Sequence, residues 1–252
     1  MIVKHDLYAP TLGRDVTLHL YLPDTYLHSQ EQYPVLYMFD GHNLFYDEDA
    51  TYGRSWRLLS HLNALPEDLI VVGIECSHEG NERLIEYAPY PFYDMEFGGH
   101  FPAKGKQTME FIVYTVKPYI DMHFPTLPDR NHTWIGGSSC GGLMSLYALY
   151  AWSKTFSKAI ALSPYVLPSE SSLFYWASHV RIKHPSFLYL SWGAQEGNTG
   201  HEFIQETKVL TTLANILLRK GVKIQFDVYP FGEHCEAQWE SQADTFLRFL
   251  FQ

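Results

Sequence analysis

Residues 134–144 carry the clearest chemical pattern in this sequence. They run from an apolar, strand-prone segment into a helical one through a cluster of small residues, Trp-Ile-Gly-Gly-Ser-Ser-Cys-Gly-Gly-Leu-Met. Residues 137–141 match G-x-S-x-G, a pattern that places a nucleophilic serine at a sharp turn between a strand and a helix. The alternative is a Gly- and Ser-rich loop without a catalytic role, but the flanking strand and helix patterns favour the turn. We therefore predict that Ser139 is a nucleophile.

The outer residues of this pattern are glycines for a steric reason. A serine at the tip of such a turn holds a strained backbone, and the residues two before and two after it approach so closely that side chains would collide. Gly137 and Gly141 remove those side chains. The helix predicted from Gly141 to about Trp152 points its positive end at the turn, so the backbone N–H of Cys140 is available to a developing oxyanion.

A serine hydroxyl is a weak nucleophile near neutral pH, so it needs a general base that is itself oriented by a carboxylate. With a G-x-S-x-G turn, the three groups follow the chain order serine, acid, histidine. His234 is the last histidine after Ser139 and follows the last predicted strand, 222–229, so we predict that it is the base. The other downstream histidines, which lie in or beside predicted helices, are His179, His184 and His201.

The acid is expected after the preceding strand, predicted over residues 186–192. Glu196 lies in the Gly-flanked loop that follows this strand, before the next helix. Its alternatives are a solvated loop residue or a helix-start residue that interacts with the helix dipole. Asp227, in the middle of a predicted strand, is the second choice of acid, and Glu233 is a poorer candidate because it is adjacent to His234 in sequence.

A second oxyanion donor is expected in the loop after the buried strand predicted at residues 34–39. Two N–H groups aimed at one developing charge stabilise it more than one does, and the second comes from this loop in proteins with a G-x-S-x-G turn. The candidates are the backbone N–H groups of Gly41, His42 and Asn43, and we favour His42. Its imidazole is expected to be packed or hydrogen-bonded and not catalytic.

The composition argues against several other classes of function. The 252 residues carry a net charge of −10, so nucleic-acid phosphates or an anionic membrane surface would repel the chain. Cys76, Cys140 and Cys235 are far apart and form no C-x-x-C pair, which argues against a structural zinc site or a disulfide framework. No H-E-x-x-H or similar ligand spacing occurs, so we predict no metal and no cofactor.

The sequence also gives an expected location and partner. No apolar signal core follows Met1, and no apolar run reaches the roughly 18 residues that a membrane helix needs, so we predict a cytoplasmic protein. We expect a small-molecule ester substrate as its partner, with no nucleic acid and no membrane. Whether the protein forms a homo-oligomer is left open.

Strand and helix patterns alternate from residue 34 onward, which is typical of a mostly parallel sheet with helices on both faces. The predicted strands are 2–8, 15–22, 34–39, 69–75, 132–136, 157–162, 186–192 and 222–229, and the predicted helices are 55–65, 108–124, 141–152, 169–179, 201–220 and one amphipathic helix around 239–250. The first two strands, with Gly13 between them, predict an antiparallel hairpin at the sheet edge.

Residues 76–106 show no clear periodicity and are rich in Gly, Pro and aromatic residues. Loops of this length in a compact domain are commonly functional or disordered, and disordered segments are poor in aromatic rings. We therefore predict a lid or pocket wall here, within a single α/β domain that spans residues 1–252.

Several motifs in this sequence resemble the esterase D-like family of α/β-hydrolases. This family includes S-formylglutathione hydrolase, the ferric-enterobactin-type esterases, bacterial feruloyl esterases and the mycolyltransferases of the antigen 85 type. The matching segments, within 34–240, are 40–45, Arg83 with 86–89, 136–147, Gly193 with Glu196, and 231–234. The resemblance implies an α/β-hydrolase fold, with Ser139 as nucleophile, Glu196 as acid and His234 as base.

The sequence departs from the family pattern at Cys140, where the family often carries Met. This departure changes the floor of the pocket and leaves the mechanism unchanged. Along the matching segments we also predict substrate contacts for Asn43, Arg83 and Tyr87.

Together these residues predict a serine carboxylesterase that forms an acyl-enzyme on a Ser-His-Glu triad and hydrolyses it with water. The aromatic segment 87–101, without a large apolar cap, favours a small acyl group or an aromatic ester. An acyltransferase, or a thioesterase of the S-formylglutathione hydrolase kind, would use the same triad. A non-catalytic binding module on the same scaffold is the rival from another class, and the presence of all three groups in the expected order argues against it.

Overall fold

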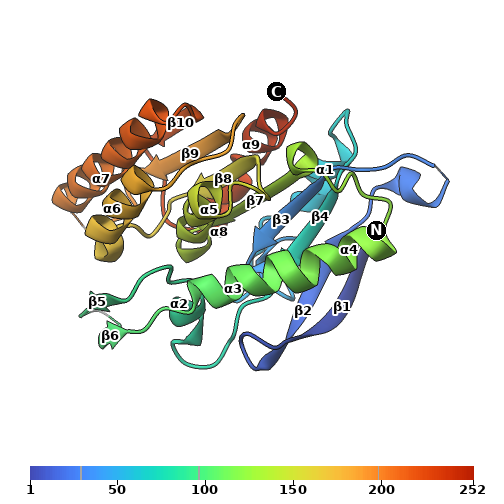
Figure 1. Ribbon diagram of the computed structural model, residues 1–252, viewed down its shortest axis with the longest axis horizontal. Coiled ribbons are helices and arrows are strands. Elements are labelled where there is room, and N and C mark those ends of the chain that lie inside the picture. The colour runs from blue at the N-terminus through green and yellow to red at the C-terminus, as the bar shows by residue number, and fades with distance from the viewer. Residues whose placement is uncertain (29, 96, 198) are drawn as a thin grey trace.

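A mixed sheet runs through the whole molecule (Figure 1). The computed structural model describes residues 1–28, 30–95, 97–197 and 199–252, and over these residues the sheet has eight strands in the order β1-β2-β4-β3-β7-β8-β9-β10. The strands are β1 (Ile2–Ala9), β2 (Arg14–Tyr21), β3 (Val35–Phe39), β4 (Ile70–Ile74), β7 (Thr133–Ser138), β8 (Lys158–Leu162), β9 (Phe187–Gly193) and β10 (Lys223–Tyr229). From β4 to β10 all neighbours pair in parallel, whereas β2 is antiparallel to β4 and β1 to β2.

Helices cover both faces of this sheet. They are α1 (Leu58–Asn63), α2 (Glu82–Glu86), α3 (Gly105–Phe111), α4 (Lys117–His123), α5 (Cys140–Ala151), α6 (Glu170–His179), α7 (Gly200–Arg219), α8 (Glu236–Glu240) and α9 (Ala243–Phe249). One apolar cluster joins the sheet to α3 through α7, and a second joins its other face to α1, α8 and α9. The predicted α/β-hydrolase fold, with its N-terminal antiparallel hairpin, is therefore confirmed.

The central strands are buried along their whole length because both of their faces are covered. All five residues of β3 are buried, and its alternate side chains enter different clusters, with Tyr37 in the first and Met38 in the second. The same holds for β8, in which Ala159 and Ile160 divide between the two clusters. This two-sided burial fixes the register of the strands, because a slip by one residue would exchange the faces.

The topology brings the predicted reactive residues to one edge of the sheet. Parallel strands end at the same edge, and the loops after β3, β7, β8, β9 and β10 all begin there. Ser139 follows β7, Glu196 follows β9 and His234 follows β10. Open α/β sheets bind their ligands at the carboxyl ends of the strands for this reason.

Residues 76–106 contain more regular structure than their lack of periodicity predicts. Outside Glu96, which the structure does not describe, the segment holds α2 and an antiparallel pair, β5 (Phe92–Asp94) and β6 (Gly99–Phe101), before α3 begins. Elements of three to five residues are too short to show a period in sequence. The rings of Phe92 and Phe101 stack with centroids 4.9 Å apart, and they pack against Tyr165.

Two predicted helices differ in detail. The helix predicted at 108–124 is one rod that begins at Gly105 and widens to a π-helical segment, Ile112–Val116, between α3 and α4 (Figure 1). The widening comes just before Pro118, which has no N–H for the carbonyl four residues earlier. The single predicted C-terminal helix is two helices, which are separated at Ser241 and Gln242. Gln242 is buried there, and its Oε1 accepts a hydrogen bond from Ser191 Oγ.

No helix in the described ranges is both long enough and apolar enough to cross a bilayer.

Candidate active site

Ser139 lies at a strained turn between β7 and α5. Its φ of 55° and ψ of −122° lie in a region that non-glycine residues rarely adopt. The turn is held by the N–H of Ser139, which donates to Leu162 O at 3.0 Å, and by the first turn of the helix, in which Leu143 N–H donates to Ser139 O. A Cβ built on Gly137 would lie 2.9 Å from the carbonyl carbon of Gly141, and one built on Gly141 would lie 2.8 Å from Phe39 Cβ, so both positions need glycine.

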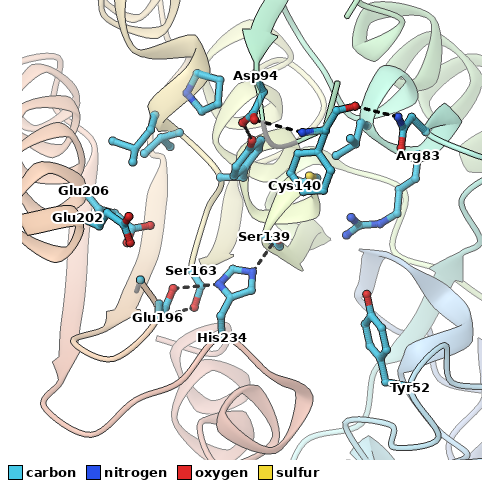
Figure 2. A pocket seen from close by; sticks show the side chains of 18 of the residues that line it. Tyr52, Arg83, Asp94, Ser139, Cys140, Ser163, Glu196, Glu202, Glu206 and His234 are labelled. Atoms are coloured by element: carbon cyan, nitrogen blue, oxygen red, sulfur yellow. Dashed lines mark hydrogen bonds and ion pairs between the residues drawn. The ribbon is translucent and has the colours of Figure 1, made fainter. Parts of the chain in front are cut away.

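The three predicted catalytic side chains are hydrogen-bonded in series (Figure 2). His234 Nε2 lies 3.0 Å from Ser139 Oγ, and His234 Nδ1 lies 3.1 Å from Glu196 Oε2. The Glu196 side chain is 3% exposed and that of His234 is 37% exposed. A buried carboxylate therefore orients an imidazole whose other nitrogen reaches the serine hydroxyl, which is the arrangement that general-base activation requires.

Ser163 fixes the second oxygen of the Glu196 carboxylate. The hydroxyl of Ser163 donates to Glu196 Oε1 at 2.7 Å, and the backbone N–H of Gly193 donates to the same oxygen. Ser163 is buried and has a φ of 45° at the end of β8. The indole N–H of Trp239 donates to Ser163 Oγ at 3.0 Å, and the Trp239 ring meets the ring of His234 edge-on at 5.1 Å.

Ser163 and Trp239 were missed as site residues because nothing in their local sequence marks them. The sequence marks Ser163 only as the residue after a predicted strand, and Trp239 only as part of a predicted amphipathic helix. The one available signal was that Ser163 follows a parallel strand adjacent in space to the strand before Ser139.

Replacing Ser163 with alanine is expected to lower kcat by about 10- to 100-fold with little change in KM. The buried Glu196 carboxylate would lose a hydrogen bond worth about 1.5–3 kcal/mol, and its hold on the His234 ring would loosen. Steady-state kinetics with p-nitrophenyl acetate would measure this. Ser163→Thr, which keeps the hydroxyl, should recover part of the loss. Equal losses in both variants would show that bulk and backbone strain at this position matter, and not the hydroxyl.

The two predicted oxyanion donors lie on adjoining elements. Cys140 is the first residue of α5, and His42 lies in the 3₁₀ turn Gly41–Asn43 that follows β3. A Cβ on Gly141 would lie 2.8 Å from Phe39 Cβ, so the end of β3 packs directly on the start of α5. Among the hydrogen bonds found in the described residues, none takes the backbone N–H of Cys140 or of His42.

Asp40 anchors the turn that carries His42. It has a left-handed φ of 57°, and its carboxylate receives two bonds from Arg83, both at 2.8 Å. Burial opposes ionisation of this carboxyl, but the Arg83 charge and its hydrogen bonds outweigh that effect and lower the pKa of Asp40. Burial also lowers the pKa of His42 to about 4, so its imidazole is neutral at pH 7.

Of the three predicted substrate contacts, only Arg83 lines the cavity at Ser139. Tyr87 is 2% exposed and its hydroxyl accepts the N–H of Asp40, so the core position leaves no surface for a substrate. Asn43 Oδ1 accepts a hydrogen bond from the N–H of Thr51, and this bond holds the loop that follows the 3₁₀ turn. The predictions for Tyr87 and Asn43 therefore do not fit, because both side chains hold the scaffold together.

The second-choice acid lies away from the triad. Asp227 is on β10, where it accepts a hydrogen bond from Gln225, and Glu196 occupies the position beside His234.

The triad opens onto a cavity of about 660 Å³, within the range of small-molecule sites. Part of its wall comes from the 76–106 segment. The lining includes Tyr52, Arg83, Leu84, Asp94, Phe97, Tyr165, Val166, Leu167, Glu202 and Glu206. In Figure 2, Glu202 and Glu206 lie together beyond Glu196, on the opposite side of the triad from Arg83 and Tyr52.

A family model described as "Putative esterase" matches residues 9–250, nearly the whole chain. The chain belongs to this esterase family. The family resemblance drawn from the motifs is thereby confirmed, and the protein is a hydrolase of the esterase type.

Individual relatives of this esterase are distant in sequence. An uncharacterized protein of Bacillus subtilis (strain 168), YbbA, is 26% identical over 190 residues, which are 71% of this chain and 68% of the relative. An IroE-like serine hydrolase from Shewanella oneidensis superimposes with a TM-score of 0.80 at 20% identity, over 100% of this chain and 80% of that one. The enterobactin esterase FES from Shigella flexneri has a TM-score of 0.76 at 17% identity, over 100% of this chain and 59% of its own.

One acid of the esterase pocket has an unusual proton affinity. Burial, and then the negative charge of Glu196, raise the pKa of Glu206 from 4.5 to about 8. The folded chain therefore keeps a proton on Glu206 between about pH 4.5 and pH 8 that the unfolded chain releases. The unfolded state binds fewer protons in this window, so this residue lowers the free energy of unfolding as the pH rises through it.

Replacing Glu206 with glutamine is expected to stabilise the esterase more at pH 8 than at pH 5. The amide carries no charge to bury, and the gain at pH 8 should be about 1–2 kcal/mol after allowance for solvent screening at this partly exposed site. Urea unfolding of both proteins at the two pH values measures the difference. Glu67→Gln, the same change at an exposed position, serves as control. A gain for Glu206→Gln that does not grow with pH would contradict the raised pKa.

Proposed function

We propose that the protein is a serine carboxylesterase that works through an acyl-enzyme on Ser139. The observation that carries this proposal is the continuous hydrogen-bonded series from Ser139 Oγ through His234 to Glu196. His234 takes the proton of the Ser139 hydroxyl as the oxygen attacks the ester carbonyl, and returns it to the departing alkoxide. Water then repeats the sequence against the acyl-enzyme and releases the acid.

The oxyanion of each tetrahedral intermediate is held by the N–H groups of Cys140 and His42. The Cys140 N–H lies at the positive end of α5, whose aligned peptide dipoles favour a negative charge there. The His42 N–H is supported by the ion pair of Asp40 with Arg83, because that pair fixes the turn after β3. The Glu196 carboxylate stabilises the imidazolium of His234 in both steps.

The cavity favours a small neutral acyl group or an aromatic ester. Tyr52, Phe97 and Tyr165 supply aromatic surface around the triad. Acidic side chains, among them Asp94 and Glu202, also line the cavity, whereas its arginine, Arg83, is paired with Asp40. An anionic substrate would meet repulsion here that a neutral one does not. Glutathione thioesters carry carboxylates, so this electrostatic argument favours an oxygen ester over the thioesterase alternative.

The proposal is tested by pre-steady-state kinetics with p-nitrophenyl acetate. We expect a burst of p-nitrophenol close to one equivalent of enzyme, followed by slower turnover limited by deacylation. A panel of acetyl, butyryl and feruloyl oxygen esters beside S-formylglutathione then defines the substrate class, and a neutral oxygen ester should exceed the thioester in kcat/KM by about 10-fold or more. A dominant thioester activity would favour the thioesterase reading. Transfer of the acyl group to an added alcohol in preference to water would favour the acyltransferase.

A further inference from the structure

A second cluster of chemically active side chains lies behind the oxyanion turn, outside the triad. One ring nitrogen each from His42 and His78 and the Sγ of Cys76 lie within 4.8 Å of one another. Cys76 and His78 follow β4, and His42 follows β3. The two loops meet because these strands are neighbours and Gly41 packs on Gly73, where an added Cβ would lie 2.4 Å from a backbone carbon.

One of the two histidines in this cluster, His42, has a buried ring nitrogen without a hydrogen-bond partner among the residues that the structure describes. His42 is 4% exposed, and its Nε2 is hydrogen-bonded to Thr51 Oγ1 at 2.9 Å. Within the part of the chain that the structure describes, its Nδ1 is buried and has no hydrogen-bond partner. A buried nitrogen without a partner costs free energy, on the order of 1–3 kcal/mol, unless something binds it. The role proposed above for His42 uses its backbone N–H and leaves the ring unexplained.

We propose that His42, Cys76 and His78 form a binding site for Zn²⁺. Two imidazole nitrogens and one thiolate are a donor set for this borderline-soft ion, whereas Mg²⁺ and Ca²⁺ prefer oxygen ligands. Zn–N bonds of about 2.0–2.1 Å and Zn–S bonds of about 2.3 Å place tetrahedral ligand atoms roughly 3.5 Å apart. In the structure these three atoms lie within 4.8 Å of one another, so they must move closer together to bind the ion. Rotations about the side-chain bonds can supply this movement.

The surroundings of the cluster have the features of a metal site. Each histidine has a partner that can orient its ring, namely Thr51 for His42 and the Glu75 carboxylate for His78, with His78 Nε2 at 2.7 Å from Glu75 Oε1. Such outer partners raise the affinity of a metal for its ligands. Cys76 and His78 also line a cleft of about 550 Å³, which gives an ion access from solvent and leaves room for water as a fourth ligand.

Binding exchanges a proton for the metal. The Cys76 thiol loses its proton to solvent as the Zn–S bond forms. Burial and the negative charge of Asp40 raise the pKa of this thiol, and the guanidinium of Arg83, already paired with Asp40, offsets part of that rise. The bound ion would tie the loop after β4 to the turn that carries the oxyanion donor.

The test uses the full-length chain stripped of metal and titrated with Zn²⁺ against a chromophoric chelator. We expect one tight equivalent, and a rise in Tm because the ion binds the folded state. Co²⁺ in place of Zn²⁺ should give a thiolate-to-cobalt charge-transfer band. Cys76→Ser should abolish that band, and His78→Ala should weaken Zn²⁺ binding by about 10-fold or more.

Matched controls separate the cluster from other ligands on the chain. His179→Ala removes another exposed histidine, and Cys235→Ser removes another cysteine, so both should bind like wild type. His78 is half exposed, so its alanine variant should fold, and the Tm of each metal-free variant checks this. The proposal is overturned if His78→Ala and His179→Ala bind Zn²⁺ equally well, or if micromolar Zn²⁺ does not bind to the wild type. It is also overturned if the charge-transfer band is lost in Cys235→Ser and kept in Cys76→Ser.

Discussion

Replacing Ser139 with alanine is expected to lower kcat for p-nitrophenyl acetate by roughly 10⁴- to 10⁶-fold and to abolish the burst. The substitution removes the oxygen that His234 activates at 3.0 Å, so no acyl-enzyme can form. The cavity and the proposed oxyanion donors remain, and they would leave a residual rate above that of water alone. Stopped-flow and steady-state assays on the same preparations measure both effects.

Ser138→Ala is the matched control for this prediction. It removes the neighbouring hydroxyl of the same motif, on a residue that is buried at the end of β7. We expect its kcat to stay within about 10-fold of wild type, because the Ser138 hydroxyl has no part in the proposed proton transfer. A loss in Ser138→Ala that matches the loss in Ser139→Ala would mean that the turn, and not the hydroxyl at position 139, was damaged.

Replacing Glu196 with glutamine is expected to lower kcat by about 10³- to 10⁴-fold with KM nearly unchanged. The amide keeps the shape of the side chain but can donate to His234 Nδ1, which would hold the ring in the wrong tautomer for accepting the serine proton. It also removes the negative charge that stabilises the imidazolium. Steady-state kinetics at a pH near 7.5 would measure the loss.

Asp227→Asn decides between the two acids that the sequence offered. It makes the same chemical change on β10, and we expect near wild-type kcat because His234 is hydrogen-bonded to Glu196. If Asp227→Asn were the more damaging of the two substitutions, the assignment of the acid would be wrong.

The positions of the triad residues could be predicted because they depend on strand order and on short local patterns. Ser139 is marked by glycines whose side chains would collide, and His234 and Glu196 are marked by their places after parallel strands. Parallel strands carry the loops after them to one edge of a sheet, so residues far apart in the chain meet there without further information.

The supporting contacts could not be predicted because they join residues with no local signature. The bond from Ser163 to Glu196 and that from Trp239 to Ser163 depend on how β8, β9 and α8 pack. Tyr87 and Asn43 are predicted to contact substrate, but Tyr87 bonds to Asp40 and Asn43 bonds to Thr51, so both hold the chain around the turn after β3. The sequence shows that such residues match a motif, but only the packed structure shows which residues their side chains contact.

The histidine and cysteine cluster shows the same limit. A C-x-x-C or H-E-x-x-H pattern places metal ligands on one element, whereas His42 comes from one loop and Cys76 and His78 from another. The spacing along the chain therefore argued against a metal site, and the proposed Zn²⁺ site rests on the packing of β3 against β4.

The most direct test of the nucleophile is covalent trapping with a fluorophosphonate, followed by mass spectrometry of the intact chain and of its peptides. An activated Ser139 should displace fluoride and take up one phosphonyl group, located on the peptide that contains residues 134–144, and His234→Ala should react far more slowly. Attachment to any other residue, or undiminished labelling of Ser139→Ala, would contradict the account.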